Sequence, residues 1–167
     1  MATGTIILPI LAAIPDPTLP PALKFASGTA RPYLAFDGSA SIEKCMWTFR
    51  MPSDYASALT AKIQWSGSSS TTVTHTVQWS IFVMALTADT DGAADSDSYD
   101  SENVVSDDIL GTTAKRIQEA SLTLTNADSV AAGDYVAIQL ARDYSDAADD
   151  LVEDAWLWAL SLEYTTS

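Results

Sequence analysis

Apolar and polar residues alternate along several short segments of the chain, beginning after the first thirty or so residues. In 43–50, for example, Cys45, Trp47 and Phe49 fall on one face of an extended chain. Alternation with a period of two residues is typical of β-strands that bury one face. The pattern predicts strands in six segments: 43–50, 58–66, 73–86, 117–125, 134–142 and 155–165.

The connections between these segments are rich in residues that favour turns. Gly, Asn, Asp, Ser and Pro recur at 52–54, 67–70, 126–128 and 133–134. Further short strands are expected at 33–36, near 5–8 and around 112–116, and one short helix at about 106–110. No internal repeat or second domain is found. The pattern therefore predicts an all-β fold, a single jelly-roll-like antiparallel sandwich of about eight strands.

The first 31 residues have a different composition from the rest of the chain. Six of the seven prolines lie within the first 32 residues, and proline lacks the amide donor that a central strand requires. We therefore divide the chain into an extended Pro-rich N-terminal arm, 1–31, and a sandwich domain, 32–167. The arm carries nine large apolar residues: Ile6, Ile7, Leu8, Ile10, Leu11, Ile14, Leu19, Leu23 and Phe25. They either pack on the chain's own sheet or bind a neighbouring subunit or scaffold, and the second interpretation is favoured because so much apolar surface seldom stays free.

The charge balance limits the partners. The chain has 22 Asp and Glu against 8 Lys and Arg, a formal net charge of −14. This charge repels nucleic acid and anionic membranes, so we expect neither as a partner. A basic partner or a cation-rich setting suits it, as does simple solubility. No apolar run is long enough to span a bilayer and no basic signal-peptide region precedes Lys24, so the chain is expected to stay in a cytosol until it is assembled or released.

Residues for catalysis are sparse. Cys45 is the only cysteine and lies in an apolar stretch, which indicates a buried, inert thiol. His75 is the only histidine, no Gly-x-Ser-x-Gly elbow occurs, and a zinc site lacks ligands. No pair of carboxylates is marked as a glycosidase pair by its context. The sequence therefore predicts a protein that is not an enzyme.

Two acidic loops hold most of the carboxylates. In the first, 87–108, five aspartates are weak candidates for Ca²⁺ ligands: Asp89, Asp91, Asp95, Asp97 and Asp100. Their spacing does not complete an EF-hand loop, so an acidic solvated loop is the favoured interpretation and no cofactor is expected. The second loop, 143–154, adds six acids, and the two loops together place strong negative charge at an end of the sandwich.

The tryptophans leave two interpretations open. Trp156 and Trp158 are expected on one strand face together with Leu160, Leu162 and Tyr164, and Trp65 and Trp79 could lie nearby. Exposed aromatic faces stack on sugars, but alternating tryptophans more often belong to a core, which is the favoured interpretation here.

Several runs resemble a group of tailed-phage virion proteins over about residues 33–166. The resemblance rests on Phe36–Ser39, Thr48–Ser57, Val83–Thr87 with Asp97–Asp100, Leu122–Ser129 with Ala132–Val136, and Leu160–Tyr164. It implies a small jelly-roll capsid decoration, or cement, protein that binds the major capsid protein on the outer capsid surface of the virion as a homotrimer. The alternative is a carbohydrate- or calcium-binding module of a tail, baseplate or head fibre. The resemblance implies no catalytic residues.

Overall fold

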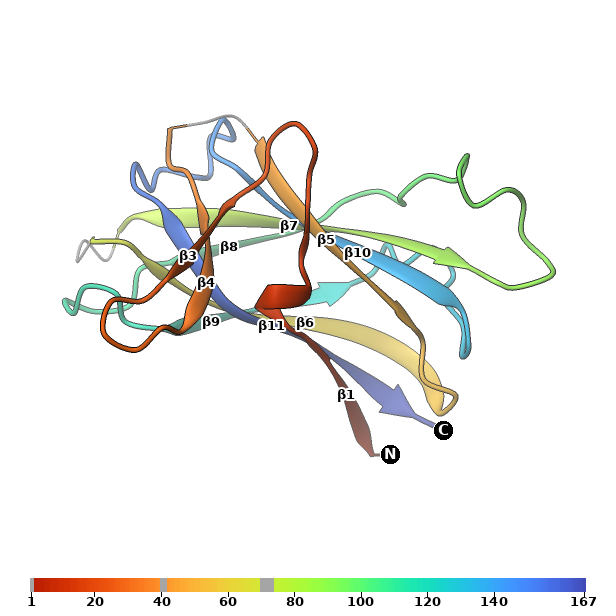
Figure 1. The fold of residues 1–167 in the computed structure, drawn as a ribbon. Coiled ribbons are helices and arrows are strands. Elements are labelled where there is room, and N and C mark those ends of the chain that lie inside the picture. The colour runs from red at the N-terminus through yellow and green to blue at the C-terminus, as the bar shows by residue number, and fades with distance from the viewer. Residues whose placement is uncertain (1, 40–41, 70–73) are drawn as a thin grey trace.

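The computed structural model describes residues 2–39, 42–69 and 74–167. Two antiparallel β-sheets lie face to face (Figure 1). The fold class that the alternating pattern predicts, an all-β jelly-roll-like sandwich, is confirmed. No helix in the described part of the chain is long and apolar enough to cross a membrane.

The first sheet runs in the order β3-β4-β11-β6-β9, and β1 also pairs with β11. Its strands are β1 (Thr3–Leu8), β3 (Ala22–Phe25), β4 (Pro32–Phe36), β6 (Tyr55–Gly67), β9 (Gln118–Leu124) and β11 (Ala155–Thr166). Strands β1 and β4 occupy the same edge of β11 at different heights, because β4 pairs with its first residues and β1 with its last.

The second sheet runs in the order β2-β5-β10-β7-β8. Its strands are β2 (Ile14–Pro15), β5 (Ile42–Arg50), β7 (Thr76–Leu86), β8 (Asn103–Asp108) and β10 (Tyr135–Asp143). Each of the six strongly alternating segments therefore contains a strand. Residues 70 and 73, which the sequence places in a turn and at the start of a strand, lie outside the described residues.

Two short predictions near residue 110 are wrong. The segment expected to form a helix, 106–110, instead lies largely in β8, which pairs along β7 from Asn103 to Asp108. The strand expected around 112–116 is a turn region. In β8 the side chains of Asn103, Val105 and Asp107 alternate with more exposed ones. So short a run does not distinguish a strand from a helix by its sequence pattern, and the pairing with β7 makes it a strand.

The core fills the space between the two sheets. Trp47 from β5, Trp65 from β6 and Trp79 from β7 are fully buried there. Trp65 and Trp79 meet edge to face at 6.2 Å between ring centroids. Aromatic side chains bury large apolar areas, so these three residues supply much of the hydrophobic stabilisation.

The N-terminal segment takes part in both sheets. β1 pairs with β11 from Thr3↔Thr165 to Leu8↔Leu160, then a 3₁₀ turn η1 (Ile10–Ala12) leads to β2 on β5, and β3 returns to β4. Trp47 donates its indole N–H to the carbonyl of Pro9 at 2.8 Å. This hydrogen bond holds the segment where it passes from the first sheet to the second. The segment thus packs on its own sandwich, one of the two arrangements that the sequence leaves open.

Candidate functional site

An aromatic cluster lies on the outer face of the first sheet where β4 and β11 pair. The ring of Tyr33 is 4.5 Å from that of Trp156 and 4.8 Å from that of Trp158, between centroids. The two indoles meet edge to face at 6.0 Å. In β4, Leu34 and Phe36 face the core, so Tyr33 faces outward and is buried only because the two indoles cover it.

A β-bulge puts both tryptophans on this outer face. Leu157 pairs with Trp65 of β6 and Ala159 with the adjacent Gln64, so Trp158 is an extra residue in β11. The extra residue shifts the alternation by one, a known effect of bulges. Residues 155 and 157 face the core before the bulge, and 160, 162 and 164 face it afterwards.

The favoured expectation for Trp156 and Trp158 is therefore wrong. Both were placed in the core with Leu160, Leu162 and Tyr164, and both are instead partly exposed on the opposite face. Trp158 is held there by a hydrogen bond from its indole N–H to Ser66 Oγ at 2.9 Å. Trp65 and Trp79 are core residues and do not contribute to the exposed face.

Two cations lie over the indole rings. Lys115 Nζ is 5.2 Å from the ring centroid of Trp156, and the guanidinium carbon of Arg31 is 5.8 Å from that of Trp158. Each such contact at an exposed site contributes about 0.5–1 kcal/mol. Within the described residues neither cation has a carboxylate within 4.0 Å.

The cluster forms the floor of a hollow of about 390 Å³. The β3–β4 turn contributes Phe25, Ser27 and Arg31 to its wall, and the turn before β9 contributes Lys115 and Ile117. Small-molecule sites are typically apolar and aromatic with a few placed polar groups, and this composition fits that description. We call this site, with Tyr33, Trp156 and Trp158 as its floor, the aromatic hollow.

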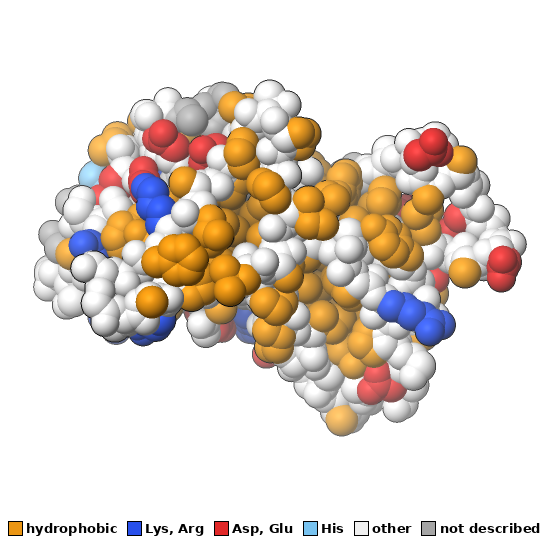
Figure 2. Space-filling view, viewed as in Figure 1, with side chains coloured by type: hydrophobic (Ala, Val, Ile, Leu, Met, Phe, Trp, Pro, Cys, Tyr) orange, Lys and Arg blue, Asp and Glu red, His pale blue; other side chains and the backbone are white. Residues whose placement is uncertain are grey.

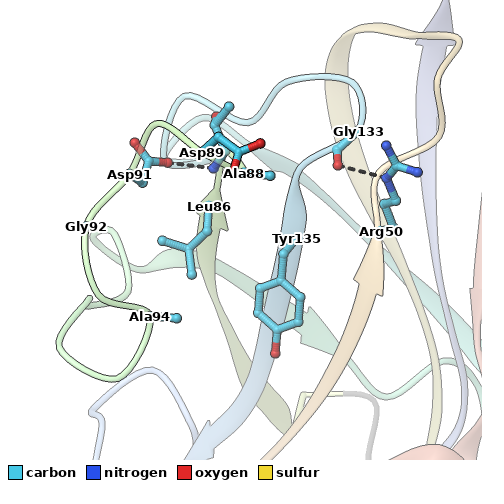
Figure 3. A pocket seen from close by; sticks show the side chains of 10 residues that line it. Arg50, Leu86, Ala88, Asp89, Asp91, Gly92, Ala94, Gly133 and Tyr135 are labelled. Atoms are coloured by element: carbon cyan, nitrogen blue, oxygen red, sulfur yellow. Dashed lines mark hydrogen bonds between the residues drawn. The ribbon is translucent and has the colours of Figure 1, made fainter.

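A second cavity, of about 490 Å³, lies between the first acidic loop and the ends of β7 and β10. Figure 3 shows Leu86 and Tyr135 pointing into the same space, with the loop that carries Asp91 curving around it. Two of its polar side chains are paired within the protein, because Arg50 Nε donates to the carbonyl of Gly133 at 3.0 Å and the Asp91 carboxylate accepts from the amide of Thr87. Tyr135 is the one aromatic residue in its described lining, whereas four aromatic residues line the aromatic hollow.

The five aspartates suggested as Ca²⁺ ligands are not brought together as a ligand set. The structure uses Asp91, Asp97 and Asp100 to accept backbone N–H groups of the loop and its neighbour, and Asp89 has a left-handed backbone with φ of +62°. Asp95 lies exposed in the same loop. Among residues 2–39, 42–69 and 74–167, no three His, Cys, Asp or Glu side chains are placed to hold a metal ion. The favoured interpretation, an acidic solvated loop without a cofactor, stays a prediction, and calcium binding stays its alternative.

The second acidic loop contains a buried ion pair that the sequence did not indicate. Arg142 on β10 donates to both carboxylate oxygens of Asp149 at 2.8 Å, and both side chains are almost fully buried. Arg142 also donates to the carbonyls of Phe36, Leu151 and Glu153. This loop is thus anchored to the sandwich rather than fully solvated.

The sequence-based view of Cys45 is confirmed. Its side chain is 2% exposed, and burial raises the pKa of its thiol well above the usual range. A thiol that stays protonated is neither a nucleophile nor a metal ligand at neutral pH. The wider prediction that the chain is not an enzyme remains a prediction.

The N-terminal residues proposed to bind a partner divide into two groups. Leu8 and Ile10 are buried in the core and Ile6 is half-buried against it. Figure 2 shows hydrophobic side chains gathered over the face that carries this segment. Six of the nine remain exposed, from 37% to 67%: Ile7, Leu11, Ile14, Leu19, Leu23 and Phe25.

Comparison with known proteins shows which solved structures share the fold. No protein-family model and no curated protein sequence matches the chain. Among solved structures, a family 11 carbohydrate-binding module from Clostridium thermocellum, in complex with a β-1,3-1,4-mixed-linked tetrasaccharide, superposes with a TM-score of 0.52 at 9% identity, covering 97% of this chain and 96% of that one. The xylan-binding module CBM15 superposes with a TM-score of 0.51 at 11% identity, covering 99% of each chain. At these identities the likeness is one of fold, and the chain has the β-sandwich fold that these modules share.

Proposed function

We propose that this protein is a carbohydrate-binding module and that its ligand binds in the aromatic hollow. The observation that carries the proposal is the pair of partly exposed indoles, Trp156 and Trp158, on the outer face of a β-sheet. A pyranose ring has an apolar face of C–H groups that packs on an aromatic ring. Two indoles and a supporting tyrosine ring form such a platform.

The surroundings of the platform support the same function. The β-bulge keeps Trp158 on the outer face, and its hydrogen bond to Ser66 fixes the ring before any ligand arrives. A preformed site avoids the entropy cost of ordering side chains on binding. The two solved modules with this fold bind a mixed-linked tetrasaccharide and xylan, which supports a saccharide ligand for a site on this fold.

The test is a screen of immobilised glycans followed by titration calorimetry of the best ligand with the parent and two variants. Trp158→Ala removes one ring of the platform, and Tyr135→Ala removes an exposed aromatic residue that lies on the other sheet. We expect Trp158→Ala to weaken binding at least about tenfold, roughly 1.4 kcal/mol, and Tyr135→Ala to leave it unchanged within twofold. Failure of every glycan to bind, or equal losses in the two variants, would refute the proposal.

A second candidate function rests on a different observation, the exposed apolar side chains of the N-terminal segment. We propose that this face attaches the protein to a larger assembly. The resemblance to tailed-phage virion proteins is the ground for proposing a capsid as that assembly, with the chain bound as a homotrimer to the major capsid protein on the outer surface. Contiguous exposed apolar surface of this kind is typical of protein–protein contacts.

Sedimentation velocity at micromolar concentration tests this candidate. We expect a trimer that Leu11→Ser dissociates and that Val152→Ser, which changes an equally exposed apolar residue outside the N-terminal segment, leaves intact. Purified capsid shells should then retain the parent and release Leu11→Ser. A monomer that does not bind shells would rule the candidate out.

A further inference from the structure

We infer that the aromatic hollow selects acidic saccharides, and that Arg31 and Lys115 bind the carboxylate of a uronic acid residue. This inference rests on the proposed carbohydrate-binding function and names the class of saccharide. It is carried by the two cations that lie over the tryptophan rings in an otherwise strongly acidic protein.

The first argument concerns charge. Only 8 of the 167 residues are Lys or Arg, against 22 Asp and Glu. Lys24, Lys62 and Arg142 form ion pairs with carboxylates of the same chain. Arg31 and Lys115 form none within the part of the chain that the structure describes, and neither do Lys44, Arg50 and Arg116. Of these five cations, only Arg31 and Lys115 line the aromatic hollow. Two cations that converge on one hollow without an internal counterion leave their charge for an external anion.

The second argument concerns the ring faces. Lys115 lies over Trp156 and Arg31 over Trp158, so a sugar that stacks on either indole must share that face with a cation or displace it. A neutral sugar offers a displaced cation only uncharged oxygen acceptors in return for the lost cation–π contact. A carboxylate on the sugar offers charge-assisted hydrogen bonds, and these are stronger than neutral ones. The hollow therefore discriminates in favour of an acidic sugar.

The third argument concerns the backbone that carries the two cations. Lys115 has φ of +61°, and Ala30, which precedes Arg31, has φ of +50°. Such left-handed conformations are uncommon for residues other than glycine, and the described chain has four more of them away from the hollow, at Ala58, Asp89, Asp128 and Ser129. They therefore define the turns that carry the two cations and do not by themselves mark a ligand site. The β3–β4 turn is closed by hydrogen bonds from the amide of Ala26 to the carbonyl of Arg31 and from the amide of Ala30 to the carbonyl of Ala26. Arg31 thus extends from a fixed turn beside the hollow.

The fourth argument is the type of cation. A guanidinium binds a carboxylate through two parallel N–H donors, and an ammonium adds a compact charge with three donors. Arg31 comes to the hollow from the β3–β4 turn and Lys115 from the turn before β9, and each lies over one of the two indoles. A carboxylate on a sugar that rests on either indole therefore meets a cation that is able to bind it.

The test is titration calorimetry with oligosaccharides supplied in two forms, as the free uronic acid and as its methyl ester. Oligogalacturonate, oligomannuronate and glucuronoxylan fragments serve as the set. The two forms share backbone and linkage and differ only at the carboxyl group, which is charged in the acid and is neutral and carries a methyl group in the ester. We expect at least one free acid to bind tenfold or more tightly than its ester. Lys115→Met and Arg31→Gln should each remove most of that difference.

Lys44→Gln is the matched control, because Lys44 lies over the ring of Phe82 in the same type of contact but on the other sheet. It should leave the preference for the free acid unchanged, and far-ultraviolet circular dichroism should show all variants folded. Equal binding of acid and ester, with both abolished by Trp158→Ala, would overturn the acidic preference and leave the proposed function standing. Binding of the acids that Trp158→Ala does not weaken would place the site elsewhere. No binding of any glycan in the screen or in this set would refute both.

Discussion

At the scale of single residues, Arg142 has the densest set of contacts in the described core. Its guanidinium donates to both oxygens of Asp149 and to three backbone carbonyls, and of these five hydrogen bonds only the one to Glu153 is partly buried rather than buried. A buried ion pair costs desolvation when it forms, but removal of one partner leaves the other charge buried and unpaired. Arg142 therefore connects β10, the end of β4 and the second acidic loop.

The first prediction concerns this pair. Asp149→Asn keeps the shape of the side chain but removes the charge opposite Arg142. We expect the free energy of unfolding at pH 7, measured by urea denaturation, to fall by about 3–5 kcal/mol. Asp95→Asn, at an exposed position in the first acidic loop, should change it by less than about 0.5 kcal/mol. Similar values for the two variants would contradict the assigned role of Arg142.

The second prediction concerns Cys45. Because burial raises the pKa of its thiol, the reactive thiolate is scarce and shielded in the folded protein. A disulfide reagent should leave the native protein unmodified over hours at pH 8 and modify one thiol per chain promptly in denaturant. Fast stoichiometric labelling of the native protein would show that the thiol is accessible.

At the scale of elements, the alternating pattern was enough to place the six strands β5, β6, β7, β9, β10 and β11, but it gave the wrong phase for the first part of β11. In β11 the pattern predicts the strand to within one residue at each end, yet it puts Trp156 and Trp158 on the wrong face. A bulge is an extra residue opposite Gln64 and Trp65 of the partner strand, and a single strand's sequence carries no record of its partner's register. The sequence therefore suggested exposed, sugar-binding tryptophans only as the less favoured of two interpretations.

The cations of the aromatic hollow were not predictable either. Arg31 and Lys115 are 84 positions apart in the sequence and come from two turns. Their meeting over the indoles depends on the pairing of β4 with β11 and of β9 with β6. Lys115 lies in a segment where a short strand was expected. Its backbone is left-handed, and the sequence gives no sign of this because glycine, the residue that usually adopts this conformation, does not occupy position 115.

The third prediction concerns strand β1, which ties the N-terminal segment to β11. Gly4 lies beneath the ring of Tyr164, where an added Cβ would come within 2.1 Å of the ring carbon Cζ. Gly4→Ala must therefore displace the ring, which donates a hydrogen bond to Asp54, or the strand itself. We expect a loss of about 1–3 kcal/mol in the free energy of unfolding and faster hydrogen exchange of the β1 amides.

Gly92→Ala is the control for this change. Gly92 lies in the first acidic loop with nothing within 4 Å of an added Cβ, so its replacement should be close to neutral. Unchanged protection of the β1 amides in Gly4→Ala would mean that β1 does not pack on Tyr164 as described.

At the scale of the whole molecule, the N-terminal segment adjoins both the aromatic hollow, to which it contributes Phe25 and Arg31, and the second acidic loop, to which Lys24 forms an ion pair. The first acidic loop extends away from the sheets beyond β7 (Figure 1). The composition gives the net charge directly, and the alternation of apolar and polar residues predicted the fold class. Neither could predict that two of the eight cations would meet over two tryptophans, because only the three-dimensional arrangement brings them together.

The central claim, that saccharides bind on Trp156 and Trp158, is tested most directly by the indole N–H signals of the five tryptophans. Each gives a separate resonance in a ¹H–¹⁵N correlation spectrum, and a titration with the best oligosaccharide of the glycan screen follows all five together. We predict saturable shifts for Trp156 and Trp158, with Trp47, Trp65 and Trp79 nearly unmoved because they are buried in the core. Saturable binding that leaves the signals of Trp156 and Trp158 in place, or the absence of any shift with every saccharide of the screen, would contradict the account.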